Sequence, residues 1–87
     1  MNQLCERIRD VVIEHGRLGD VSDISEATDL YTLGMTSHAT VAVMLALESA
    51  FDVEFPDELL TREVFESVQN IAKAVQGLLA ADGGGAS

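Results

Sequence analysis

The segment that decides the fold is GMTSHATVAVMLALESAF, residues 34–51. Ser37 precedes a run of small and apolar residues, and a serine hydroxyl at that place can cap the unpaired amides of a helix start. The unbroken apolar stretch from Val41 to Leu47 is seven residues long, whereas a membrane span needs about 20. We therefore predict a helix of a soluble protein from Ser37 to about Phe51, with Gly34 just before its start.

This predicted helix has two faces when its residues are projected at 100° each. We assign one face to the core, namely Thr40, Val43, Leu47, Ala50 and Phe51. The opposite face consists of His38, Val41, Ala42, Leu45, Glu48 and Ser49. Charge appears on that face only at Glu48, so a partner docking there would rely on shape and apolar contact. The sequence leaves open whether Val41 and Leu45 are exposed or covered by another helix.

Helical periodicity recurs on both sides of the central segment. Apolar residues at positions 4, 8, 11 and 12 predict a first helix that Gly16 and Gly19 end. The polar stretch Arg17–Thr36 is expected to be an ordered but irregular loop. Pro56 can open a short third helix, and Ser67 can cap a last helix. The fold class is therefore all-α, a four-helix bundle of three main helices and one short helix with a long loop after the first.

The length of 87 residues allows one domain. We place a single domain at residues 1–80 and a mobile tail at 81–87, ADGGGAS, which has nothing to bury. A domain this small hides only about 60% of the surface that its unfolded chain exposes, so an enclosed active site is not expected. The length thus favours a binding or carrying role over an enzyme.

The charge is strongly acidic, with 15 acidic against 5 basic residues and a net charge of −10. Such a chain would be repelled by a nucleic-acid backbone. A hydrophobic content of 47% is too high for a disordered acidic tail. The single Cys5 excludes an intramolecular disulfide, and charged residues stand where an export signal would need its apolar stretch. We expect a cytoplasmic location, with neither nucleic acid nor membrane as partner.

Metal and catalytic sites are not predicted. The segment from Asp20 to Tyr31 lacks the glycine and the final glutamate of a calcium loop, having Ser25 and Tyr31 at those positions. The two histidines are too far apart in the sequence to suggest a metal cluster. Ser37 and His38 suggest a hydrolase, but adjacent helical residues point about 100° apart and no acidic residue completes a triad.

Ser37 has another chemical use at the start of a helix. Unpaired amides and the positive end of the helix dipole favour a phosphate ester there. The alternative is a plain capping serine, which is the commoner fate of a serine before an apolar run. The spacing by itself does not decide between the two.

The wider segment ATDLYTLGMTSHATVAVMLALESAFDVEFPDELL, residues 27–60, resembles the central signature of the acyl carrier protein family. The matching residues are Asp29, Leu30, Leu33, Gly34, Ser37, Val41, Leu47, Glu48, Phe51, Asp52, Pro56 and Asp57. Helix order and lengths extend the resemblance over about residues 4–79. It implies a carrier with covalent 4′-phosphopantetheine on Ser37, which holds acyl or aminoacyl cargo as a thioester and does no chemistry itself. The alternative is a phosphopantetheine-free helical protein-interaction module.

The departures from the family pattern bear on the partners. Thr36 stands where the family has Asp, His38 where it has Leu, and Ala39 and Ala42 where carriers of fatty acid synthesis show acids. GMTSHATV and FPDELLTREVF look more like the stand-alone aminoacyl carrier proteins. The implied partners are a phosphopantetheinyl transferase, an AMP-forming acyl or amino acid ligase and a downstream transferase or synthase. We expect the protein to be a monomer. We expect the partner-binding residues to be Thr36, His38, Val41, Ala42, Leu45 and Glu48.

Overall fold

The structure is a computed structural model that describes residues 2–19 and 24–86, with side chains described for residues 3–19 and 24–80. Its elements are α1 (Asn2–His15), α2 (Ser37–Phe51), the 3₁₀ turn η1 (Asp57–Leu59), α3 (Arg62–Phe65) and α4 (Val68–Ala86). Over the described residues the architecture is entirely helical, which confirms the predicted all-α class of three main helices and one short one.

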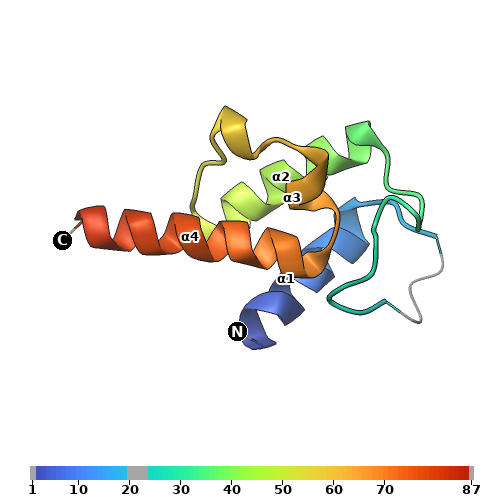
Figure 1. Cartoon of the computed structure of the whole chain (residues 1–87), viewed down its shortest axis with the longest axis horizontal. Helices are drawn as coiled ribbons and strands as arrows, with labels where there is room; N and C mark the ends of the chain where they lie inside the picture. The colour runs from blue at the N-terminus through green and yellow to red at the C-terminus, as the bar shows by residue number, and fades with distance from the viewer. Residues whose placement is uncertain (1, 20–23, 87) are drawn as a thin grey trace.

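The helices form a bundle in which α1 contacts both α2 and α4 while the short α3 lies against α4 (Figure 1). The segment before α2 lies at one end of the bundle, and α2 starts there. The Ser67 hydroxyl accepts a hydrogen bond from the Asn70 amide at 3.1 Å, so the predicted cap of the last helix is confirmed.

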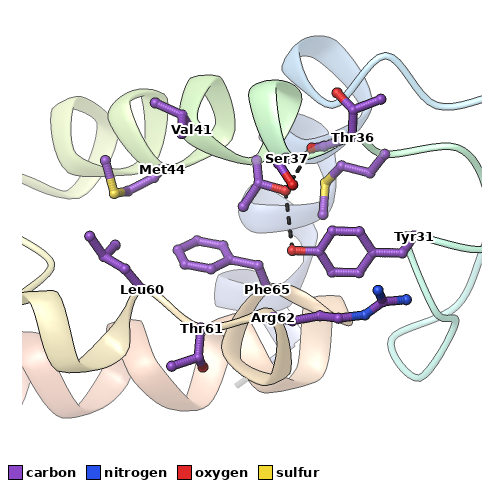
Figure 2. Close-up of a pocket in the computed structure, with 11 residues that line it drawn as sticks. Tyr31, Thr36, Ser37, Val41, Met44, Leu60, Thr61, Arg62 and Phe65 are labelled. Carbon is purple, nitrogen blue, oxygen red and sulfur yellow. Dashed lines mark hydrogen bonds between the residues drawn. The ribbon is translucent and has the colours of Figure 1, made fainter.

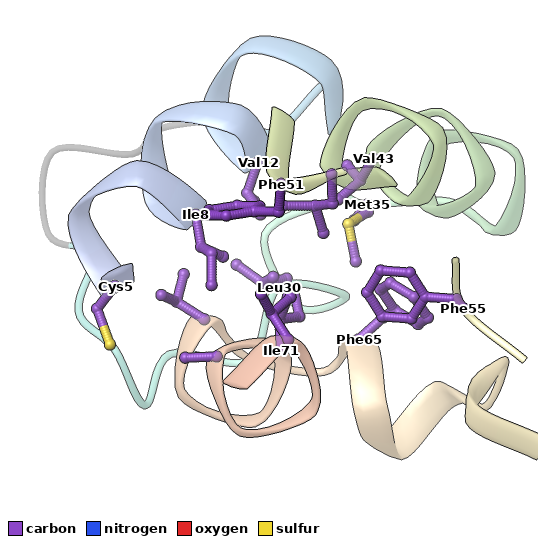
Figure 3. Packing of buried hydrophobic residues seen from close by; sticks show 14 of the residues in the cluster. Cys5, Ile8, Val12, Leu30, Met35, Val43, Phe51, Phe55, Phe65 and Ile71 are labelled. Atoms are coloured by element: carbon purple, nitrogen blue, oxygen red, sulfur yellow. The ribbon is translucent and has the colours of Figure 1, made fainter. Parts of the chain in front are cut away.

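The core lies where α1, α2 and α4 meet (Figure 3). Each main helix contributes apolar side chains at helical spacing, and buried residues of the connecting segments, such as Leu30 and Met35, join them. The fully buried members include Ile8, Val12, Leu30, Val43, Leu47, Ile71 and Val75. The rings of Phe55 and Phe65 add a tilted pair with centroids 5.4 Å apart. These side chains fill the space between the helices.

The buried face of α2 differs from the predicted one. The buried residues are Ala39, Val43, Leu47 and Phe51, whereas Thr40 is half-buried and Ala50 is exposed. The burial follows an i, i+4 row, so the helix is rotated slightly from the orientation that the projection favoured. Ala50 is too small for its burial to decide the orientation, because the free energy of burial scales with apolar area.

The predicted short helix opened by Pro56 is two separate pieces. Pro56 precedes η1, and Leu60 then leaves helical geometry with ψ of 63°. α3 starts afresh after Thr61, whose hydroxyl accepts a hydrogen bond from the Val64 amide at 3.2 Å. The second cap explains why the helix is interrupted rather than continuous.

The long loop is ordered by hydrogen bonds where it is described. The Leu30 amide donates to the Glu66 carbonyl at 2.7 Å, and the Gln69 amide donates to the Glu26 carbonyl at 2.8 Å. Both bonds tie the loop to the junction of α3 and α4. The part of the rejected calcium loop at residues 20–23 lies outside the described residues.

The end of the chain was predicted as a tail from residue 81. The backbone of α4 continues to Ala86, so the helix extends further than the sequence indicated. Ser87 and the side chains of residues 81–86 lie outside the described residues, and the division into a domain at 1–80 and a tail at 81–87 stays a prediction.

Candidate functional site

Ser37 is the first residue of α2 and its side chain is exposed. The hydroxyl that caps this helix belongs to its neighbour Thr36, which accepts a hydrogen bond from the Ala39 amide at 3.0 Å. The prediction that Ser37 is the cap is therefore wrong, since the extended backbone of Thr36 (φ −92°, ψ 169°) makes it the last residue before the helix. This leaves the Ser37 hydroxyl without a capping role.

The turn that presents Ser37 depends on Gly34. Its φ of 110° is positive, a conformation that residues with a side chain rarely adopt. Just after it, Met35 is buried and its amide donates to the Leu30 carbonyl at 3.1 Å. The chain thus turns sharply at Gly34, anchors itself at Met35 and enters α2 with Ser37 facing solvent.

A pocket of about 560 Å³ begins at Ser37 and lies between α2 and the segment that contains α3 (Figure 2). Its lining residues come from the loop, from the first two turns of α2 and from residues 60–65. They are Tyr31, Met35, Thr36, Ser37, Thr40, Val41, Met44, Leu60, Thr61, Arg62 and Phe65. The pocket is large enough for a small organic group, because ligand sites range from about 300 to 1,000 Å³.

One end of the pocket is polar. The Thr40 hydroxyl lies 2.9 Å from the Thr36 carbonyl oxygen and 3.2 Å from the Tyr31 hydroxyl. The Arg62 guanidinium lies over the Tyr31 ring, with its central carbon 4.6 Å from the ring centroid. Tyr31 therefore joins the loop, α2 and α3 beside Ser37, and Figure 2 shows this arrangement.

The other end of the pocket is apolar and continues onto the surface. Val41 is 50% exposed, Leu45 56% and Leu60 45%. We call these three side chains the apolar face. The sequence left open whether Val41 and Leu45 are covered, and the structure shows that they are exposed. His38 is also exposed and Ala42 is half-buried.

Glu48 has a structural contact that the sequence did not indicate. Its carboxylate accepts a hydrogen bond from the Phe55 amide at 2.8 Å, and the side chain is half-buried. The carboxylate thus holds the segment after α2 as well as carrying charge near the apolar face.

The sequence did not identify Tyr31, Thr40 and Arg62 as neighbours in one site. They belong to the loop, α2 and α3, and their side chains meet only because the loop is fastened to the α3–α4 junction. Periodicity within one helix carries no information on such a contact.

Within the described residues, His, Cys, Asp and Glu side chains form no group of three or more that could hold a metal ion. Over the same part of the chain, no helix has both the length and the apolar character needed to cross a membrane.

Comparison with known proteins defines the class. Residues 3–75 match the family described as phosphopantetheine attachment site. An aminoacyl carrier protein of Agrobacterium fabrum is 42% identical over 73 residues, which cover 83% of this chain and 88% of the relative. An acyl carrier protein of Caulobacter vibrioides is 32% identical over 76 residues, covering 87% of this chain and 91% of the relative.

A solved structure agrees with these relatives. It contains a carrier protein from Agrobacterium tumefaciens in complex with an engineered glycine:[carrier protein] ligase of Bradyrhizobium japonicum and ATP. The match has a TM-score of 0.79 and 40% identity, and covers 84% of this chain and 96% of that one.

The chain belongs to the phosphopantetheine-attachment family of acyl and aminoacyl carrier proteins. It is a carrier rather than an enzyme, and it holds acyl or aminoacyl cargo as a thioester on a covalent 4′-phosphopantetheine arm. The arm supplies a flexible tether and a thiol, which raises the local concentration of cargo at a docked partner to about the millimolar range. The alternative of a phosphopantetheine-free interaction module is not supported.

Proposed function

We propose that Ser37 is the residue that bears the phosphopantetheine arm. The observation that carries this proposal is the exposed Ser37 hydroxyl at the first position of α2, free of the capping role that Thr36 performs. The amides of the first helical turn and the positive end of the helix dipole favour a phosphodiester there. The adjoining pocket gives the arm a surface to lie against.

The cargo in this proposal is an amino acid, activated by an AMP-forming ligase. The support comes from the aminoacyl carrier protein of A. fabrum and from the carrier protein bound to the glycine:[carrier protein] ligase. A related complex holds a glycylated carrier protein that is 26% identical to this chain, with a TM-score of 0.72. A phosphopantetheinyl transferase attaches the arm, and a downstream transferase or synthase takes the cargo from a monomeric, cytoplasmic carrier.

The partner-binding residues in this proposal are those around the start and outward side of α2, namely Thr36, His38, Val41, Ala42, Leu45 and Glu48. The exposure of Val41 and Leu45 supports their part in docking. For Glu48 and Thr36, any contact with a partner would be additional to the hydrogen bonds that they make within the chain.

The test is intact mass spectrometry after incubation with coenzyme A and a broad-specificity phosphopantetheinyl transferase. Wild type should gain one phosphopantetheine and Ser37→Ala none, with circular dichroism showing unchanged helix content. Ser49→Ala on the same helix is the matched control and should be modified like wild type. Modification of Ser37→Ala would overturn the assignment.

A further inference from the structure

Positive charge beside Ser37 is confined to one residue. Among the described residues that line the adjoining pocket, Arg62 alone carries a formal charge, and neither Asp nor Glu is among them. The whole chain has a net charge of −10, so a cation without a neighbouring acid in the same lining is unusual here. Attaching the arm at Ser37 brings a negatively charged phosphodiester to the edge of this pocket.

The contact that Arg62 makes in the unmodified protein is a weak one. Its guanidinium lies over the Tyr31 ring, 4.6 Å from the centroid, and the side chain is exposed. No carboxylate of the described residues forms an ion pair with it. A cation–π contact at an exposed position is weaker than charge-assisted hydrogen bonds to phosphate oxygens, which the planar guanidinium can form two at a time. The side chain is therefore available to an anion.

The uncharged polar groups around Ser37 are already engaged. The Thr36 hydroxyl takes the Ala39 amide at 3.0 Å. The Thr40 hydroxyl lies 2.9 Å from the Thr36 carbonyl oxygen and 3.2 Å from the Tyr31 hydroxyl. The capped start of α2 thus offers a phosphate fewer free donors than an uncapped one. A phosphodiester at Ser37 gains most from a donor outside the helix.

Arg62 belongs to an element other than that of Ser37. It is the first residue of α3, directly after the cap Thr61, and α3 packs against α4. Figure 2 shows Ser37 and Arg62 on opposite walls of the pocket, with Tyr31 beside both. A contact between Arg62 and a phosphate on Ser37 would therefore link α3 to the start of α2.

We propose that Arg62 is the counter-ion of the arm's phosphodiester. On modification of Ser37 the guanidinium leaves the Tyr31 ring and donates hydrogen bonds to the phosphate oxygens. This inference rests on the proposed function, in that Ser37 must carry the arm. It implies that modification itself stabilises the domain, because it adds a link between α2 and α3, and that the root of the arm is fixed in direction while its thiol end stays free.

The experiment measures the Tm of the unmodified and the phosphopantetheine-bearing form of each variant, at low salt and at about 1 M salt. Intact mass and peptide mapping first show whether Ser37 bears the arm, and that result tests the proposed function alone. The variants are Arg62→Gln, Arg62→Lys and the control Lys73→Gln, which removes a charge from an exposed position of α4 outside the pocket lining. Each variant is compared with its own unmodified form, so a general destabilisation by the substitution cancels.

Modification should raise the Tm of wild type by about 4 °C at low salt, and high salt should remove most of that rise because it screens an exposed ion pair. Arg62→Gln should lose most of the rise. Arg62→Lys, which keeps the charge without the planar fork, should lie between the two. Lys73→Gln should behave as wild type.

NMR signals of the two side chains report the movement directly. Modification should shift the Arg62 Nε–H signal and the Tyr31 ring protons, because the guanidinium leaves the ring. Arg7 and Phe51 are the matched reference, since the Arg7 guanidinium lies over the Phe51 ring at 4.4 Å in another part of the molecule. Their signals should stay in place.

Three results on a correctly modified protein would overturn the counter-ion role. The first is the same change in Tm for wild type and Arg62→Gln, because Arg62 would then have no part in it. The second is a rise in Tm that high salt leaves intact, since the arm would then be held through its neutral groups. The third is an Arg62 Nε–H signal and a Tyr31 ring that modification leaves unchanged.

Discussion

At the first turn of α2, two adjacent hydroxyl residues have different roles. Thr36 satisfies an amide of the helix start, whereas Ser37 projects into solvent. We predict that Thr36→Ala lowers the free energy of unfolding by about 1 kcal/mol, the usual value of a lost cap. In a domain of this size that corresponds to a fall in Tm of about 4–8 °C.

Thermal and urea unfolding of three variants checks this division of roles. Thr36→Ser keeps a capping hydroxyl and should stay close to wild type, and Ser37→Ala should also be nearly neutral. A larger loss for Ser37→Ala than for Thr36→Ala would show that the cap has been assigned to the wrong residue.

Cys5 is a buried thiol on α1. Burial raises its pKa above the ordinary value, and the nearby Glu26 carboxylate raises the pKa further by charge and by hydrogen bonding. The thiol is thus more easily deprotonated in the unfolded chain. Its contribution to stability is full below the ordinary thiol pKa and declines as the pH rises through that value toward the folded one.

Urea unfolding of wild type and Cys5→Ala across neutral to alkaline pH measures this contribution. The difference in free energy of unfolding between the two should shrink at alkaline pH, because only wild type has a buried thiol whose contribution to stability is lost on deprotonation. Native Cys5 should also react with iodoacetamide far more slowly than in urea. Equal alkylation rates in the native and unfolded protein would contradict the burial argument.

At the scale of elements, the connection from α2 to η1 is held by a side chain of the helix. The Glu48 carboxylate accepts the Phe55 amide, and hydrogen bonds to charged groups contribute about 1.5–3 kcal/mol. We predict that Glu48→Ala lowers the free energy of unfolding by that amount, while Glu48→Gln, which keeps an acceptor oxygen, costs half as much or less.

Glu54→Ala is the control, since Glu54 is exposed in the same connection and a surface change costs within about 0.5 kcal/mol. Faster exchange of the Phe55 amide in Glu48→Ala would locate the effect. If Glu48→Ala and Glu54→Ala were equally mild, the bond would contribute nothing measurable.

At the scale of the whole molecule, exposed apolar side chains are unevenly placed around the candidate site. Val41 and Leu60 of the apolar face line the pocket, whereas Ile13, which is 37% exposed, belongs to α1. We predict that Leu45→Ser reduces the kcat/KM of ligase loading on the order of tenfold, as a central apolar contact is worth more than about 1 kcal/mol. Ile13→Ser should load like wild type.

Loading rates at low and high salt separate apolar from electrostatic docking. The loss in Leu45→Ser should persist at high salt, because screening weakens charge interactions and leaves apolar contact intact. Equal loading of Leu45→Ser and Ile13→Ser would show that the partner docks elsewhere.

The sequence by itself determined the all-helical class, the C-terminal end of α1, both ends of α2, the cap at Ser67 and the candidate attachment residue. These features depend on local periodicity, on capping chemistry and on a family signature within residues 27–60, all of which are written along the chain. Ser37 could be singled out because its position at a helix start can be recognised from neighbouring residues. The sequence also predicted that Ser37 caps this helix, whereas the cap is Thr36.

Only the tertiary structure decided which residues share a site. The pocket joins Tyr31, Thr40 and Arg62 across the loop, α2 and α3, and Glu48 reaches Phe55 across a turn. The break between η1 and α3 and the exact buried row of α2 also depend on contacts between elements. Such contacts depend on how whole helices pack against one another. Small differences in buried area and in hydrogen bonding determine that packing, and the spacing of residues within a single segment does not encode it.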